Sequence, residues 1–344
     1  MDKRNWAKSM SAAGSSSLVG RDLLDCQEWA YDELETVFDL ALDLKRRLKV
    51  REPHELLRSK TFFMIFYATS TRTRNSFEAA LTQLGGHAHY LETKTMRIGD
   101  PGAPEEIKDT ARVLERYGHG IGVRAYTQNF GEGEQLIREY AKQAEIPVIS
   151  MESDRYHPCQ ALADMLTIKE KFPDWHGKKY VQAWAYSPGA RRVPAVPQSN
   201  ITMMTRYGMD VVYVRPKEFT LDPSIIDQAK RNAANSGGTF SETDDLKEAI
   251  DGADVVYMRN HTTLSYGKIG AEAEQSIIDR YKSWTCTAEL MDFTNSGSIF
   301  MHSLPADRGR EVTNEVMDGP HSVIFDQAEN RLHVQKAVLA LTLI

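Results

Sequence analysis

Hydrophobic positions in the first half of the chain alternate between helix-like and strand-like patterns. Over residues 31–48, apolar side chains recur at the spacing of one helix face. The apolar run of residues 61–67 predicts a buried strand, and Ser70 with Thr71 can cap a helix that extends to Leu84. The alternation continues, with strands predicted at 87–91, 120–123 and 147–151 and helices at about 105–117 and 133–144. Such alternation indicates a parallel sheet covered by helices.

A second series follows a long helical segment at residues 160–171, which we interpret as the connector between two domains. Its predicted strands lie at 179–185, 210–214, 254–258 and 298–302. The stretch SPGARRVPAVPQ, residues 187–198, contains three prolines, which fix φ and remove backbone donors. We therefore predict a stiffened loop there rather than the interior of an element.

The length of the chain also favours two domains. A single hydrophobic core stops growing near 250–300 residues, and this chain has 344. The expected fold is α/β, with two doubly wound parallel-sheet domains joined by helices. We place the first domain at residues 1–156 and the second at 157–326, with a C-terminal helix at 327–344 packing back on the first.

The composition excludes several classes of protein. A formal net charge of -6 and a pI near 6.0 give no general attraction to nucleic acid, so any anion site must be local. No run of about 18 apolar residues predicts a membrane span, and the N-terminus lacks the apolar stretch of a signal peptide. The three cysteines, Cys26, Cys159 and Cys286, are too few and too dispersed for a disulfide framework or a cysteine-based zinc site. A cytoplasmic location is expected.

The most informative stretch is FYATSTRTR, residues 66–74, where a buried strand ends and a helix begins. Free N–H groups and the helix dipole favour an anion at such a place, and hydroxyls with a guanidinium add directional hydrogen bonds. Ser70, Thr71, Arg72 and Thr73 form the predicted phosphate cradle. The alternative is an N-cap followed by solvated arginines. A nucleotide-binding P-loop is excluded because its glycines and Gly-Lys-Ser/Thr ending are absent.

The stretch HPCQ places His157 and Gln160 at the start of the connector helix. A neutral imidazole and an amide can both donate to a carbonyl oxygen that becomes negative during acyl transfer. The alternative is a purely structural histidine.

Three further segments place polar residues at strand ends or on the C-terminal helix. Arg124 ends the strand GIGVR, and the strand of residues 298–302 leads into His302, Ser303 and Leu304. Ligands of open α/β sheets gather at this carboxyl edge. Arg331 lies early in the apolar C-terminal helix, for which the alternative is a core-docking helix with one exposed arginine.

In order and spacing, these five segments resemble the aspartate and ornithine carbamoyltransferase family, from about Leu23 to the C-terminus. The resemblance implies a carbamoyl-phosphate site formed by Ser70, Thr71, Arg72, Thr73, Arg97, Arg124, His157, Gln160 and Arg331. It implies catalytic roles for Arg124, His157, Gln160 and His302. Arg74 would be a structural ion-pair partner. No metal and no cofactor are expected, because carbamoyl phosphate is already activated and the enzyme need only position an amine and stabilise developing charge.

Family resemblance also implies a homotrimer with shared active sites. The loop of residues 94–99 would reach a neighbour's site, where Arg97 would strengthen phosphate capture. The alternative is a solvated loop arginine.

Two departures from the ornithine enzymes concern the second substrate, which Arg259, Ser303 and Leu304 are expected to contact. Arg259 aligns with an aspartate that receives the α-amino group of ornithine, so a masked amine or an extra carboxylate is favoured. The alternative is an internal salt bridge of Arg259. The stretch WAYSPGARRVPAVPQ resembles the proline-rich loop of the knotted transcarbamylases, which include the acetylornithine, succinylornithine and YgeW types.

Three functions follow from these observations. The preferred one is a knotted carbamoyltransferase that acts on a modified or unusual amino acid, and the first alternative is an ornithine carbamoyltransferase. The remote alternative is a nucleotide-binding oxidoreductase or noncatalytic module, which should show a G-x-G-x-x-G stretch that we do not find. The sequence leaves the acceptor amine and the direction of the reaction open.

Overall fold

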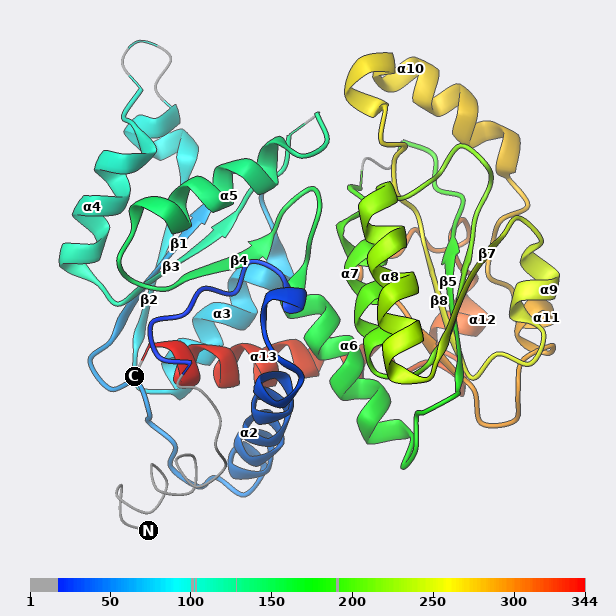
Figure 1. The fold of residues 1–344 in the computed structure, drawn as a ribbon, viewed down its shortest axis with the longest axis horizontal. Coiled ribbons are helices and arrows are strands. Elements are labelled where there is room, and N and C mark those ends of the chain that lie inside the picture. The colour runs from blue at the N-terminus through cyan, green and yellow to red at the C-terminus, as the bar shows by residue number, and fades with distance from the viewer. Residues whose placement is uncertain (1–17, 100–101, 103, 128, 190–191, 344) are drawn as a thin grey trace.

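The computed structural model describes residues 18–343 apart from 100–101, 103, 128 and 190–191. Two parallel sheets lie side by side, each with helices against it (Figure 1). The first has the order β2-β1-β3-β4, from β1 (Thr61–Phe66), β2 (His87–Glu92), β3 (Gly120–Arg124) and β4 (Val148–Glu152). The second has the order β7-β6-β5-β8-β9, from β5 (Lys179–Trp184), β6 (Asp210–Val214), β7 (Thr239–Thr243), β8 (Val255–Arg259) and β9 (Ile299–Met301). The predicted pair of parallel-sheet α/β domains is confirmed.

The helices of the first half are α2 (Tyr31–Lys49), α3 (Thr71–Gln83), α4 (Ile107–Tyr117) and α5 (Glu132–Gln143). Those of the second half are α7 (Ala195–Arg206), α8 (Pro223–Ser236), α9 (Leu246–Ile250), α10 (Tyr266–Ile278), α11 (Ala288–Met291) and α12 (Asn314–Met317). Helix α6 (Pro158–Lys171) lies between the sheets, and α13 (Ile324–Thr342) lies in the first half, against α2, α3 and α6 (Figure 1). Single 3-10 turns occupy η1 (Cys26–Glu28), η2 (Thr93–Thr95), η3 (Arg97–Gly99) and η4 (Asp279–Tyr281).

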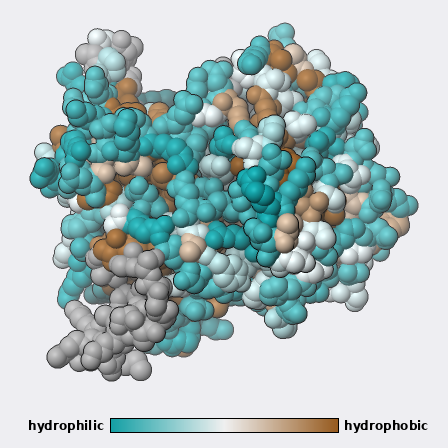
Figure 2. All heavy atoms as spheres, viewed as in Figure 1, coloured by the Kyte–Doolittle hydropathy of each residue, from teal (hydrophilic) through white to brown (hydrophobic). Residues whose placement is uncertain are grey.

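Alternate residues of the central strands face different cores. On β1, Met64 packs toward α2, α3 and α13, whereas Ile65 packs toward α4 and α5. On β8, Tyr257 belongs to the core that contains α6 and α13, whereas Met258 faces the α9 and α12 side. Because both faces of each sheet are buried, these strands appear in the sequence as continuous apolar runs. The surface in Figure 2 is mostly polar, with apolar residues in separate spots.

The long helix α6 runs from the edge of the first sheet toward the second and packs against α13 and α7. The C-terminal helix α13 also lies against α2 and α3, so the end of the chain returns to the first half. Among the described residues, no helix is both long enough and apolar enough to cross a membrane.

The loop prediction for residues 187–198 was wrong at its end, because α7 begins at Ala195. Pro194 is its N-cap and Pro197 lies in its first turn, where a backbone N–H has no helical acceptor and proline is tolerated. The loop itself lies against the segment after β8 and against α10, since Thr262 N donates to Arg192 O (2.8 Å) and Gly189 N donates to Gln275 Oε1 (2.7 Å). Residues 190–191 of this loop lie outside the described residues, and the knot stays a prediction.

Candidate active site

The carboxyl ends of β1, β3, β4, β8 and β9 meet at one cavity of about 670 Å³ between the two sheets. Its described wall contains six arginines but only two acidic residues, so it is suited to anions. The arginines are Arg72, Arg74, Arg124, Arg192, Arg259 and Arg331, and the acidic residues are Glu78 and Glu152. The cavity brings together the following predicted residues: Ser70, Thr71, Arg72, Thr73, Arg124, His157, Gln160, Arg259, Ser303, Leu304 and Arg331.

The predicted cradle forms the first turn of α3. Ser70 is the N-cap, and its Oγ accepts from Thr73 N (3.2 Å). Thr73 is buried and its Oγ1 accepts from Arg331 Nη2 (3.0 Å). Burial first, and then the neighbouring arginines, lower the pKa of Arg72 to about 10. Arg72 therefore faces a site that is short of negative charge, as expected where an anionic substrate completes it.

The next arginine is bound differently. Arg74 Nε donates to Glu78 Oε1 (2.9 Å), and the guanidinium lies 3.9 Å from the ring centre of Tyr90. These contacts fit the structural ion pair expected for Arg74. Arg74 is exposed, whereas Arg72 is half-buried in the cavity wall, so the solvated-arginine alternative does not describe Arg72.

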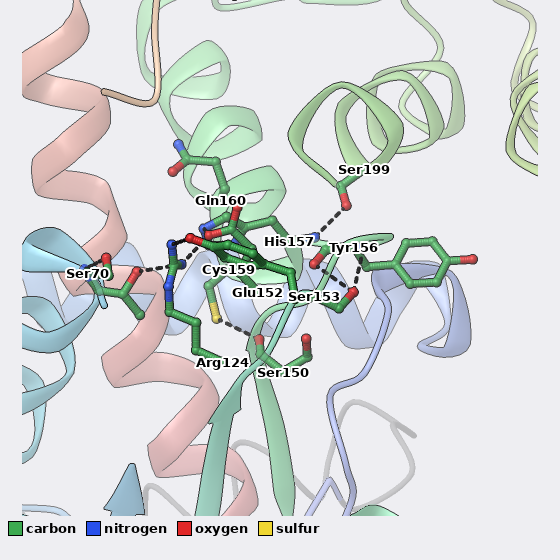
Figure 3. A network of polar contacts seen from close by, with 12 residues as sticks. Ser70, Arg124, Ser150, Glu152, Ser153, Tyr156, His157, Cys159, Gln160 and Ser199 are labelled. Atoms are coloured by element: carbon green, nitrogen blue, oxygen red, sulfur yellow. Dashed lines mark hydrogen bonds and ion pairs between the residues drawn. The ribbon is translucent and has the colours of Figure 1, made fainter. Parts of the chain in front are cut away.

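Arg124, Glu152 and His157 converge beside Gln160 (Figure 3). Arg124 Nη1 forms a buried ion pair with Glu152, at the end of the neighbouring strand β4. His157 Nε2 lies 3.7 Å from Glu152 Oε2, and its Nδ1 has no partner. Burial, followed by the surrounding arginines, lowers the pKa of His157 well below its ordinary value, so the ring is neutral at pH 7.

Sequence reasoning missed Glu152. Its only signal was its position directly after the predicted strand of residues 147–151, 28 positions after Arg124.

The orientation of Gln160 is fixed by its two partners. Its Nε2 donates to Asp164 Oδ1 (2.7 Å), and its Oε1 accepts from Arg331 Nη1 (2.7 Å). A carboxylate only accepts and a guanidinium only donates, so the amide cannot turn over. Arg331 is buried between Gln160 and Thr73, which contradicts the alternative of an exposed arginine on a docking helix.

The loop after β9 presents Ser303 and Leu304 to the cavity, whereas His302 is not on the wall of that cavity. His302 Nδ1 accepts from Leu304 N (2.9 Å), and its Nε2 lies 3.6 Å from Glu311 Oε2. The ring is fully buried, and it contributes to a smaller adjoining cavity of about 200 Å³. His302 therefore does not line the cavity in which a catalytic role was expected for it.

Arg259 ends β8 and is buried at the cavity wall. Within the described residues, its Nε and Nη1 have no hydrogen-bond partner, and no carboxylate forms an ion pair with it. The internal salt bridge considered above is therefore not found. Burial first, and Arg192 next, lower the pKa of Arg259.

Glu311 connects three segments at this end of the cavity. It pairs with Arg192, accepts from Asn260 N (2.8 Å) and accepts from Asp307 N (2.7 Å). Burial alone would raise the pKa of Glu311, but His302 and Arg192 beside it lower it below its ordinary value. Neither Arg192 nor Glu311 was predicted, because 119 residues separate the pair in sequence.

Arg97 lies elsewhere. It is exposed on η3 and does not line the cavity of its own chain.

Two parallel-sheet domains meet at an arginine-rich cavity beside the N-terminus of α3, an arrangement suited to an anionic substrate. The chain belongs to the aspartate/ornithine carbamoyltransferase family. The family model of the carbamoyl-P binding domain matches residues 21–170, and that of the Asp/Orn binding domain matches residues 193–342. The protein is a carbamoyltransferase, and the oxidoreductase alternative is wrong.

Relatives include enzymes for two different acceptors. The chain is 41% identical to the ornithine carbamoyltransferase of Halalkalibacterium halodurans over 95% of this chain and 97% of that one. The ornithine carbamoyltransferase structure from Pyrococcus furiosus has a TM-score of 0.84 at 41% identity, covering 96% of this chain and 99% of that one. An acetylornithine transcarbamylase bound to acetylcitrulline has a TM-score of 0.87 at 37% identity, covering 94% and 99%. These similarities leave the acceptor open.

Proposed function

We propose that this carbamoyltransferase uses an acceptor amine on a modified or unusual amino acid, and that Arg259 binds an anionic group or acyl oxygen of that acceptor. The observation that carries this proposal is the buried guanidinium of Arg259, which has two unpartnered nitrogens at the cavity wall. A buried charge without a partner is costly, and a substrate oxygen would supply the missing partner.

The proposed binding of carbamoyl phosphate depends on the predicted cradle. The phosphate would bind at the N-terminus of α3, where Ser70, Thr71 and Thr73 offer hydroxyl or backbone groups and Arg72 offers a guanidinium. Arg124 and the neutral ring of His157 would lie at the carbonyl. In the reaction, the amine nitrogen bonds to the carbonyl carbon, and the bond from that carbon to the phosphate oxygen breaks. Phosphate leaves with the electron pair, and the amine loses one proton.

The acceptor end is cationic, which favours a modified acceptor over ornithine. An unmodified ornithine would bring its α-ammonium toward Arg259 and Arg192, and two cations repel in a buried site. An acylated α-amine removes that charge and adds an oxygen, and a further carboxylate pairs with the guanidinium directly. Ornithine itself remains the alternative, supported by relatives at 41% and 42% identity.

We also propose a homotrimer in which the loop carrying Arg97 completes the site of a neighbouring copy. Its exposure and its distance from its own cavity wall support this arrangement. The expected cytoplasmic location stays a prediction.

A panel of acceptors tests the substrate proposal. The protein is incubated with carbamoyl phosphate and, separately, ornithine, acetylornithine, succinylornithine, 2,3-diaminopropionate, putrescine and aspartate. Ureido product and released phosphate are measured. We expect an acceptor with a masked α-amine or an additional anionic group to exceed ornithine in kcat/KM. Ornithine as the best acceptor would contradict the proposal and favour the alternative.

A further inference from the structure

One buried carboxylate lies at the centre of a hydrogen-bond chain between the two domains. Asp164 on α6 is fully buried, and its Oδ1 accepts from Gln160 Nε2 (2.7 Å) and Gln327 Nε2 (2.6 Å). Its Oδ2 accepts from Asn200 Nδ2 (3.0 Å). Because an ionised carboxylate can only accept, each amide must turn its nitrogen toward it and its oxygen elsewhere.

Toward the first domain, the oxygen of Gln160 faces Arg331, whose Nη1 donates to it (2.7 Å). The other terminal nitrogen of Arg331 donates to Thr73 Oγ1 (3.0 Å), inside the phosphate cradle. The same hydroxyl accepts from Arg124 Nη1 (3.5 Å). Asp164 thus sets which end of the Gln160 amide faces Arg331.

Toward the second domain, the oxygen of Gln327 accepts from His302 N (2.9 Å), where the loop after β9 begins. Gln327 Nε2 also donates to Tyr257 Oη (3.2 Å), two residues before Arg259 on β8. The second branch of the chain therefore ends at the two segments that carry the proposed acceptor contacts.

We propose that Asp164 is a positioning residue that holds the carbamoyl-phosphate cradle and the acceptor loops in one geometry by orienting the amides of Gln160 and Gln327. The inference rests on the proposed carbamoyl-phosphate site but not on the identity of the acceptor. Asp164 does not line the cavity and touches no substrate in this arrangement. It acts through Gln160 on one side and through the backbone of the β9 loop on the other.

If Asp164 served stability alone, its substitutions would have a different effect on activity than if it positioned the site. Removing the carboxylate leaves the buried amide donors of Gln160, Gln327 and Asn200 without their acceptor, which costs stability in either role, and it also lets the amides rotate. If Asp164 positions the site, its substitution should lower the rate by more than the loss of stability explains, because displacements of about 1 Å near the chemistry can cost about 100-fold in rate.

The experiment compares Asp164→Asn, which keeps one acceptor oxygen, with Asp164→Leu, which keeps none. The control is Thr167→Val on the same helix, which removes a buried hydroxyl bonded to Ala163 O (2.7 Å) and Asn330 Nδ2 (2.9 Å), outside the chain described above. For each variant, kcat, the KM for carbamoyl phosphate and Tm are measured with the best acceptor of the panel. Gln327→Met, which breaks only the second branch, replaces Asp164→Leu if that variant does not fold.

We expect kcat to fall about 10-fold in Asp164→Asn and about 100-fold in Asp164→Leu, whatever the sign of the change in Tm. The KM for carbamoyl phosphate should change by less than about threefold, because the cradle keeps its hydroxyls and Arg72, and Gln327→Met should lower kcat at least about fivefold. Folded variants that keep kcat within twofold of the wild type, or that lose no more than Thr167→Val, would overturn the inference. If the wild type itself does not turn over carbamoyl phosphate, the proposed function fails instead.

Discussion

At the scale of single residues, Arg72 is one of the arginines that line the cavity. It is half-buried and forms no ion pair with the described chain, and its pKa is lowered to about 10 by burial and by neighbouring arginines. A group in this situation stabilises a bound anion rather than the fold.

We predict that Arg72→Ala lowers kcat/KM by about 100-fold or more, in the range expected for removing a charged donor to the transition state. Tm should change by no more than a few degrees, because no ion pair or core contact is lost. Arg112→Ala on the exposed face of α4, which removes ion pairs with Glu115 and Glu145, is the control and should leave kcat/KM unchanged. An unchanged kcat/KM in Arg72→Ala would remove the cradle from the active site.

The residues that sequence reasoning could and could not find differ in one physical respect. Ser70, Arg124 and His157 lie where a predicted strand or helix ends, and the carboxyl edge of a parallel sheet is where ligands gather. Glu152 and Glu311 act by pairing with arginines that are distant in sequence, and no local pattern specifies such a pair. For His302, only part of the outcome could be predicted. Its position at a strand end was predicted, but its direction depends on Glu311.

At the scale of elements, burial made several strands easy to predict. β1, β3 and β8 are buried along their length and form apolar runs. β7, with the polar sequence TFSET and mostly exposed residues, lies at the edge of its sheet and was missed. Helix α7 was also missed, because the three prolines of residues 187–198 favour a loop, although proline is tolerated in the first turn of a helix.

The C-terminal helix α13 contains a buried lysine that gives a test of its packing against α2. Lys336 Nζ approaches only neutral acceptors, Leu44 O (3.3 Å) and His54 Nε2 (3.4 Å), and burial lowers its pKa from 10.5 to about 8. Between these two pH values the unfolded chain binds more protons at this position than the folded chain. The contribution of Lys336 to the free energy of unfolding therefore rises as the pH rises through this window.

We predict that Lys336→Met gains stability relative to the wild type at pH 7 and that this gain shrinks as the pH rises toward 10. Methionine is a suitable replacement because it keeps a long unbranched side chain without the charge. Chemical denaturation of both proteins at several pH values gives the difference in the free energy of unfolding, in which all other titrating groups cancel. A difference that stays constant from pH 7 to 10 would contradict the packing described for α13.

At the scale of the whole molecule, the two sheets contribute different halves of one site. The first supplies the cradle, Arg124 and Glu152, the second supplies Arg259 and the loop after β9, and α6 crosses between them. Like His302, Arg97 is a predicted site residue that does not line the cavity of this chain. Its proposed role requires a second copy.

Mixing two defective variants tests that role. If Arg97 completes a neighbouring site, then mixed trimers of Arg72→Ala and Arg97→Ala contain some sites in which both arginines are intact. We expect activity to recover, to a fraction of the wild-type value, after the two inactive proteins are dissociated and reassembled together, whereas each variant reassembled alone stays inactive. Confirmed mixed trimers without recovery, or full activity of Arg97→Ala alone, would count against shared sites.

The claim that Arg259 selects the acceptor is tested by the acceptor preference of Arg259 variants. Arg259→Asp reverses the charge at the end of β8, and Arg259→Leu removes it without reversal, so the pair separates attraction of the native acceptor from repulsion of ornithine. For each variant, kcat/KM is measured across the acceptor panel, and the KM for carbamoyl phosphate is measured with the acceptor held in excess. We predict that both variants weaken the native acceptor about 100-fold or more, that Arg259→Asp improves ornithine relative to it, and that the KM for carbamoyl phosphate changes little. An acceptor preference that stays the same in both folded variants would contradict the assignment of Arg259 to the acceptor and remove the main reason for preferring a modified substrate over ornithine.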